Sequence, residues 1–266
     1  MLDSLLRPMR LSPAEQTLWY LNIAAALFLL VRLYSQQLVK IYPALFTYFA
    51  ADALQQIVAL TFGRSPKAYA EIYFVGQALK VALAVWVVLE LYQLALAQQP
   101  ALAKFGRRTL DYLFCCAVLV GLVNFVFQIG ANPGKMKYPT AFTRLESTVA
   151  LVTLIVLVLI TGFLLWFPVR ASRNVALCLG AFVFYYFQRW AGLMFTTFWP
   201  LRTHEFSNVM LTASFICFVI WGIALRGRGE ATTVITGHRW NPKEAERLTL
   251  QLDAINSRLV RLVARP

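Results

Sequence analysis

The chain is poor in the side chains on which most enzymes depend. It has only two histidines in 266 residues, and 12 acidic residues against 25 basic ones. His204 and His238 both lie outside the long apolar stretches, which excludes a bis-histidine haem and argues against a histidine-rich zinc site there. His204-Glu205 begins like a zinc-protease motif, but Asn208 stands where that motif needs its second histidine. We therefore predict no metal site and no cofactor.

Other catalytic motifs are also missing. The sequence contains no GxSxG nucleophile elbow, no P-loop and no GxGxxG fingerprint. The last apolar stretch has no lysine, which argues against a retinal Schiff base there. The four cysteines lie in apolar stretches without CxxC spacing, which argues against a disulfide framework. We predict that the protein is not an enzyme.

What the chain has in abundance is apolar sequence. Its hydrophobic fraction is 59% and its mean hydropathy is +0.62, whereas a soluble domain is only about 45–50% apolar. About 20 apolar residues in a helix cross the ~30 Å hydrocarbon core of a bilayer. Seven stretches reach that scale, at 17–34, 42–62, 69–97, 109–129, 145–167, 174–199 and 206–225. The sequence predicts an all-α, polytopic bundle of seven transmembrane helices with a C-terminal amphipathic helix.

The pattern divides the chain into four parts. Residues 1–16 resemble a short interfacial segment, and residues 17–226 form the expected seven-helix transmembrane domain. A linker rich in Gly and Thr is expected at 227–240, before a cytoplasmic helix at 241–266. With seven spans, the N-terminal side carries eight Lys and Arg residues and the opposite side carries fourteen. The positive-inside rule therefore predicts an outer N-terminus and a cytoplasmic C-terminus.

Charged residues inside the expected spans are the strongest candidates for a site, because burying each costs at least ~2.5–3.5 kcal/mol. Asp52, Lys80 and Arg189 each lie ~15 Å from the outer face, near the expected midplane. Four glutamines lie within about one helical turn of that level. The candidate ligand or ion site comprises Asp52, Gln55, Gln56, Gln77, Lys80, Gln188 and Arg189.

Two interpretations of this site stay open. The polar groups can simply hold helices together, or they can bind a ligand. In the second case two cations and one anion favour an anionic ligand, a lipid headgroup or a quinone carbonyl, unless Lys80 is neutral. Closer to the cytoplasmic face, we expect Arg32 and Glu90 to form a structural ion pair.

The tail repeats apolar residues at alternating steps of three and four, as in a coiled-coil seam. A short coiled coil or docking helix and a basic amphipathic helix on the anionic inner leaflet both fit this pattern. The expected partner-binding or membrane-binding residues are Leu248, Leu252, Ile255, Leu259, Leu262, Arg258 and Arg261.

Several short motifs resemble one family. They are Gly237-His238-Arg239-Trp240-Asn241-Pro242, Leu252-Asp253-Ala254-Ile255-Asn256, Leu164-Leu165-Trp166-Phe167-Pro168, Ser172-Arg173-Asn174 and Val88-Leu89-Glu90-Leu91-Tyr92. This set is similar to an uncharacterised family of bacterial seven-helix inner-membrane proteins with a GHRWNP-type cytoplasmic tail. The resemblance implies a bacterial inner-membrane setting and brings no activity with it.

These features favour an interaction protein, an accessory or scaffold subunit of a membrane assembly that docks through its C-terminal helix. The alternative is a receptor-like sensor or small transporter that uses the midplane site. The expected partners are the lipid bilayer and protein partners or further copies of the chain, bound through the tail. Nucleic acid is not expected, because no folded basic domain is present to carry the net charge of +13.

Overall fold

The described part of the protein is built almost entirely from long helices, three of which begin at proline. The computed structural model describes residues 13–62, 66–97, 99, 103, 107–116, 119, 123, 138–166, 170–198, 203–235, 246–248, 250, 251, 254 and 257. The long helices are α2 (Pro13–Ser35), α3 (Pro43–Phe62), α4 (Pro66–Ala95), α6 (Tyr138–Trp166), α7 (Arg173–Phe198) and α8 (Thr203–Ala224). Proline suits a first helical position, since its fixed φ is helical and its missing N–H is not needed there.

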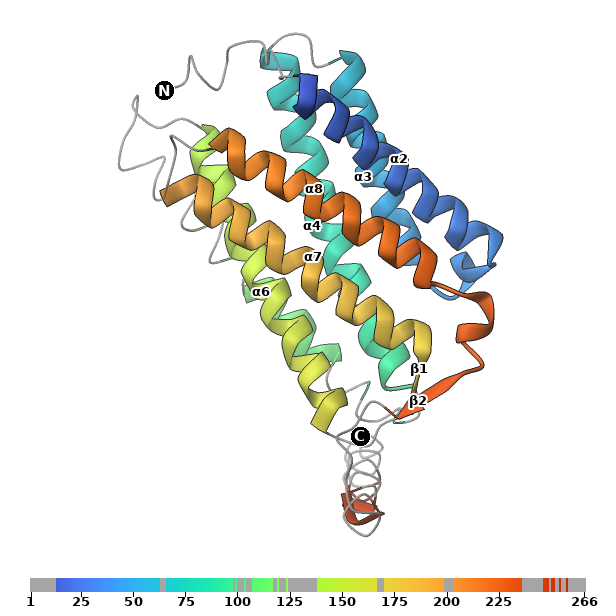
Figure 1. Ribbon diagram of the computed structural model, residues 1–266. Helices are drawn as coiled ribbons and strands as arrows, with labels where there is room; N and C mark the ends of the chain where they lie inside the picture. Colours follow the sequence, from blue (N-terminus) through green and yellow to red (C-terminus); the bar gives the residue numbers. More distant parts are fainter. Residues whose placement is uncertain are drawn as a thin grey trace.

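The long helices lie side by side and form a closed ring (Figure 1). Around this ring α2 packs against α3, α3 against α4, α4 against α6, α6 against α7, α7 against α8, and α8 against α2. A further contact between α4 and α7 crosses the ring. The first and last long helices of the described chain are therefore neighbours, although they are far apart in sequence.

Short elements gather at one end of the bundle, which we call the strand end (Figure 1). Strand β1 (Arg170–Ser172) precedes α7, and β2 (Thr233–Ile235) follows α8. They pair antiparallel, with Ala171 opposite Val234. The 3-10 helices are η1 (Leu38–Lys40) and η3 (Gly227–Gly229). The sequence suggested only a linker at 227–240, but its described part holds both η3 and β2.

Aromatic side chains fill the centre of the ring. Phe49 of α3 meets Phe218 and Trp221 of α8 edge-on, with ring centroids 5.2 Å apart in both pairs. Tyr48 lies edge-on to Phe182 of α7 at 5.6 Å. Edge-to-face geometry of this kind adds ~0.5–1.5 kcal/mol per pair beyond the burial of area. The aromatic core thus joins α3 to α7 and α8 across the ring.

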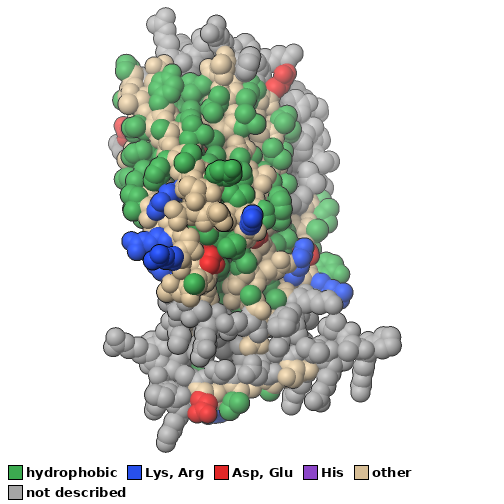
Figure 2. Space-filling model, turned by 90° about the vertical axis from the view of Figure 1, so that its right-hand side faces the viewer, with side chains coloured by type: hydrophobic (Ala, Val, Ile, Leu, Met, Phe, Trp, Pro, Cys, Tyr) green, Lys and Arg blue, Asp and Glu red, His purple; other side chains and the backbone are tan. Residues whose placement is uncertain are grey.

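The outer surface is also apolar. Val31, Leu54, Leu159, Val209 and Ile220 are all more than 60% exposed. Figure 2 shows hydrophobic side chains over much of one face, with the visible Lys and Arg side chains nearer the strand end. A continuous apolar exterior of this kind marks a surface that meets another apolar phase.

In the described part of the chain, four helical segments are long and apolar enough to cross a membrane: Pro13–Ser35, Glu71–Ala95, Ser147–Trp166 and Glu205–Ala224. Helices α3 and α7 coincide with two further expected spans but fall outside this set. Both helices carry charged and amide side chains, among them Asp52 in α3 and Arg189 in α7.

Three expected regions lie partly or wholly outside the described residues. Of the span expected at 109–129, residues 109–116, 119 and 123 are helical and the others are not described. The N-terminal segment is described only from residue 13. In the tail, residues 246–248, 250, 251, 254 and 257 are helical, and Leu248 is half-buried. The other tail residues expected to bind a partner or the membrane lie outside the described part: Leu252, Ile255, Leu259, Leu262, Arg258 and Arg261.

Candidate functional site

An ion pair between α3 and α4 forms the centre of the candidate site. Lys80 Nζ lies 2.9 Å from Asp52 Oδ1, and the two side chains are only 8% and 6% exposed. Gln56, one helical turn beyond Asp52, donates its amide N–H to Asp52 Oδ2 at 2.8 Å. Both carboxylate oxygens therefore accept a hydrogen bond, which a buried charge needs in order to be tolerated.

Helix α7 adds a second cation beside this pair. Arg189 donates to Gln77 Oε1 of α4 at 2.5 Å and to the Tyr185 hydroxyl at 3.4 Å. Tyr48 of α3 in turn donates to the Tyr185 hydroxyl at 3.2 Å. Polar contacts thus connect three helices. We call Asp52, Gln56, Gln77, Lys80 and Arg189 the polar layer.

A small cavity opens beside the polar layer. Its lining residues are Tyr48, Gln77, Lys80, Val81, Val149, Ala150, Tyr186 and Arg189. The cavity has a volume of about 10 Å³, which is roughly the least that holds one water molecule. In this conformation the layer can therefore admit a water or a small ion, but not a quinone or a lipid headgroup.

Two of the expected glutamines are not in the polar layer. Gln55 donates to the backbone carbonyl of Tyr73 at 3.4 Å and lies against Gly76, where an added Cβ would be 2.3 Å from Gln55 Cδ. Gln188 turns toward α8 and donates to Ser214 Oγ at 2.8 Å. Both side chains link neighbouring helices, and the structure does not bring them to the Asp52–Lys80 pair.

The expected ion pair between Arg32 and Glu90 is wrong. Arg32 donates to the carbonyls of Gly222 and Leu225 at 3.2 and 3.4 Å, where α8 ends. Glu90 accepts the backbone N–H groups of Ala44 and Leu45 at 2.9 and 3.2 Å, where α3 begins. Helix ends leave such groups without intrahelical partners and carry partial charges, so each side chain satisfies a helix terminus instead.

A second polar cluster, which the sequence did not predict, lies at the strand end. Glu230 Oε1 accepts hydrogen bonds from the Tyr42 hydroxyl at 2.6 Å and from Asn174 Nδ2 at 2.8 Å. Asn174 Nδ2 also donates to the carbonyl of Arg226 at 2.8 Å. Tyr42 and Asn174 are both fully buried. In the sequence, Asn174 is a polar residue at the start of an expected span, and Glu230 is an acidic residue in the expected linker. Nothing in the sequence indicates that the two side chains meet.

Glu230 belongs to a segment that crosses the strand end, residues 226–235, which we call the strap. The strap begins with a hydrogen bond from the Gly227 N–H to Gln36 Oε1 at 2.8 Å, beside the end of α2. Further along, the Arg173 N–H donates to the carbonyl of Thr232 at 2.9 Å. Its last residues form β2 and pair with β1. The strap thus ties the base of the tail to several parts of the bundle.

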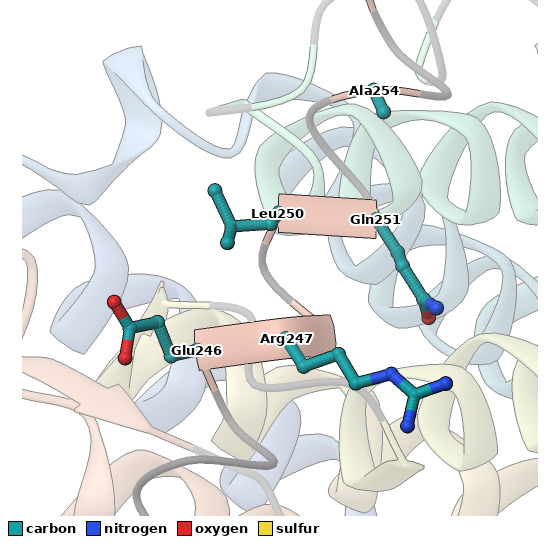
Figure 3. Close-up of a pocket in the computed structure, with 5 residues that line it drawn as sticks. All are labelled: Glu246, Arg247, Leu250, Gln251 and Ala254. Carbon is teal, nitrogen blue, oxygen red and sulfur yellow. The ribbon is translucent and has the colours of Figure 1, made fainter.

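The described part of the tail has a shallow hollow of its own. Glu246, Arg247, Leu250, Gln251 and Ala254 line it, and all five come from the tail (Figure 3). Figure 3 shows Glu246 and Leu250 pointing to one side while Arg247 and Gln251 point to the other. The pairs are four residues apart, as on two faces of a helix. The hollow is a helix surface, and its lining includes no other element of the described chain.

No group of three or more His, Cys, Asp or Glu side chains is placed to hold a metal ion in the described part of the chain. Comparison with known proteins identifies no relative: no family model, no curated protein and no solved structure matches the chain. The site must therefore be interpreted from its own geometry.

Proposed function

We propose that the protein is a multi-pass inner-membrane interaction protein of bacteria, an accessory or scaffold subunit that docks partners through its C-terminal helix. In this proposal seven helices cross the membrane, the N-terminus lies outside, and the strand end faces the cytoplasm. The protein has no catalytic role. Its partners are the surrounding lipid and either other proteins or further copies of the chain.

The observation that carries the proposal is the fixed base of the tail. The strap is held by Glu230 with Tyr42 and Asn174, and by the pairing of β2 with β1. A solvated tail needs no such attachment, because ordering each backbone residue costs ~1–2 kcal/mol. A docking helix gains from it, since a fixed base lowers the entropy lost when a partner binds.

The test removes the apolar seam of the tail and leaves the strap intact. We would replace Leu248, Leu252, Ile255 and Leu259 with Ser in the full chain, and analyse it in nanodiscs by native mass spectrometry. The matched control replaces the polar residues Gln251, Asn256 and Ser257 with Ala. The proposal expects a discrete larger assembly in the native chain and the control, and its loss in the seam variant. An assembly that survives the seam variant contradicts docking through the tail.

A second candidate function is favoured by the buried Asp52–Lys80 pair and the cavity next to it. An ionisable pair between membrane helices is a candidate ion pathway or ligand counter-ion. The cavity limits the occupant to a water or small ion, so this candidate is a receptor-like sensor or small transporter for an ion.

Proteoliposomes test this second candidate. We would impose gradients of protons, Na⁺, K⁺ or Cl⁻ and follow flux with trapped dyes, and follow conformation by intrinsic tryptophan fluorescence. A response to one ion that disappears in Asp52→Asn would support the candidate. The reversed pair, Asp52→Lys with Lys80→Asp, is the control that restores an ion pair. Absence of response to all four gradients would refute it.

A further inference from the structure

Two arginines of the strap have side chains that no other part of the described structure binds. Arg226 lies directly before η3 and Arg228 lies within it, and both side chains are exposed. Neither guanidinium group forms a hydrogen bond or an ion pair in the described part of the chain. The acid nearest to them in sequence, Glu230, already accepts hydrogen bonds from Tyr42 and Asn174. The strand end therefore presents two positive charges without an acidic partner in the described structure.

The backbone that carries these two side chains is held in place. The carbonyl of Arg226 accepts the N–H of Gly229 at 2.8 Å and Nδ2 of Asn174 at 2.8 Å. Between the two arginines, the Gly227 N–H donates to Gln36 Oε1 at 2.8 Å, beside the end of α2. These bonds use only backbone groups of the strap and leave its guanidinium groups exposed. A fixed backbone reduces the entropy that is lost when such side chains bind a ligand.

An apolar surface begins next to these arginines. Ile220 and Ile223 lie one helical turn apart in α8, which ends two residues before Arg226. Val31 and Tyr34 lie one turn apart in the neighbouring helix α2, and all four side chains are at least 60% exposed. Figure 2 shows the side of the molecule on which α2 lies in Figure 1, with Lys and Arg side chains gathered below the hydrophobic ones. Membrane helices present this order where they pass from hydrocarbon to headgroups.

A phospholipid has the chemistry that fits both surfaces. A guanidinium group donates two parallel N–H bonds to phosphate oxygens, and it stays charged when it does so. The acyl chains attached to the same phosphate match the apolar faces of α2 and α8, which a soluble acidic partner would leave uncovered. A zwitterionic headgroup carries an ammonium group beside its phosphate, and two arginines repel that group. An anionic headgroup avoids this repulsion.

We infer that Arg226 and Arg228 bind the headgroup phosphate of an anionic phospholipid, whose acyl chains lie along the exposed apolar faces of α2 and α8. The inference rests on the proposed function as a membrane protein, because it needs the strand end at a bilayer surface. It identifies one lipid partner by its chemistry and its place in the fold.

Native mass spectrometry of the full chain in detergent micelles tests the inference, because it resolves each bound lipid and gives its dissociation constant. We would titrate phosphatidylglycerol, which is anionic, and phosphatidylethanolamine, which is zwitterionic. The test variant is Arg226→Gln with Arg228→Gln. The matched control is Arg107→Gln with Arg108→Gln, which removes the same charge from two exposed arginines in the helical segment 107–116. A third variant, Arg226→Lys with Arg228→Lys, keeps the charges and lacks the forked N–H groups.

The inference expects the native chain to bind its first phosphatidylglycerol more tightly than phosphatidylethanolamine. Each strap arginine replaced by Gln should weaken phosphatidylglycerol binding about fivefold, the control should bind as the native chain does, and the Lys variant should fall between. Equal affinity for the two lipids, or an equal loss in the strap variant and the control, overturns the inference.

A further outcome separates lipid binding from protein binding. If the strap variant loses a larger protein assembly while its affinity for phosphatidylglycerol is unchanged, the arginines bind an acidic protein and the lipid inference is wrong. The seam variants described above leave both arginines in place. Loss of docking through the tail and loss of the lipid site are therefore measured on different variants, and either proposal can fail without the other.

Discussion

The polar layer and the strand-end cluster both contain carboxylates, but the two regions compensate the carboxylate charge in different ways. In the polar layer a carboxylate between helices is balanced by a cation, with Lys80 Nζ 2.9 Å from Asp52. At the strand end, carboxylates are balanced by helix termini and neutral donors, as when Glu90 accepts two backbone N–H groups of α3. Between helices the backbone is already paired, so only a side chain can compensate a charge. At helix ends the backbone itself supplies the partner.

The difference predicts unequal sensitivity to mutation. Removing one member of the ion pair leaves a full charge buried between helices. Removing a member of the strand-end cluster leaves a neutral group or a charge near a helix end. The free energies of unfolding of matched variants therefore test whether the two regions differ.

The largest effect is expected for Lys80→Met, which keeps the apolar stem and removes the charge opposite Asp52. Loss of one partner of a buried pair costs ~3–5 kcal/mol. Reversible unfolding in mixed micelles measures this loss. The reversed pair, Asp52→Lys with Lys80→Asp, should recover part of it. If Lys80→Met lowers the free energy of unfolding no more than a strand-end variant does, the two regions do not differ in the way proposed.

The next largest effect is expected for Asn174→Ala. This change deprives the Arg226 carbonyl and Glu230 of a buried donor, at a cost of ~1–3 kcal/mol. The matched control is Asn22→Ala, which removes a bond from Nδ2 to the Leu211 carbonyl between α2 and α8. Single interhelical bonds of that kind average ~0.6 kcal/mol. The same unfolding measurement compares the two variants. If Asn174→Ala and Asn22→Ala lower the free energy of unfolding equally, the bonds of Asn174 to the strap contribute no more than one interhelical bond.

A smaller effect is expected for Glu90→Ala, which removes the side chain that caps the start of α3. Loss of a helix cap costs ~0.5–2 kcal/mol. Glu90→Gln loses the charge at the positive end of the helix and one of the two acceptors, but it should lose less than Glu90→Ala, because one backbone N–H of α3 keeps its partner. Thermal unfolding of both variants tests this order. If Glu90→Gln lowers the thermal stability as much as Glu90→Ala, or more, Glu90 has a role other than capping α3.

The smallest effect is expected for Gln188→Ala. Its one bond in the described structure joins α7 to Ser214 of α8 at 2.8 Å, and such a bond is worth ~0.6 kcal/mol. Ser214→Ala should cost about the same amount, and the double variant should cost no more than either alone. Additive losses, measured by unfolding in micelles, would mean that the two side chains act separately.

Depth along an expected span was a good guide to some contacts and a poor guide to others. It placed Asp52 and Lys80 at one level, and the structure joins them. It placed Gln188 and Arg189 at one level too, but adjacent residues on a helix point about 100° apart, so they face different neighbours. Depth gives height along the bundle, whereas the direction of a side chain depends on the order of helices around the ring.

The strand end was hard to predict for a different reason. Opposite charges at similar depth suggested a pair between Arg32 and Glu90, but helix termini lie closer to each of them. The strap has only three-residue strands, and β2 lies in a stretch whose Gly and Thr content suggested a linker. Its structure depends on partners far away in sequence, such as Asn174 for Glu230, which no local pattern reveals.

The contact between α2 and α8 has a consequence for biosynthesis. Because these neighbours are the first and last long helices of the described chain, the ring stays open until α8 has been made, and Asn22 and Arg32 must wait for their partners on it. The strap follows α8, so it can fasten only after the ring has closed. If the tail docks partners as proposed, only a chain whose bundle has closed would present it from a fastened strap.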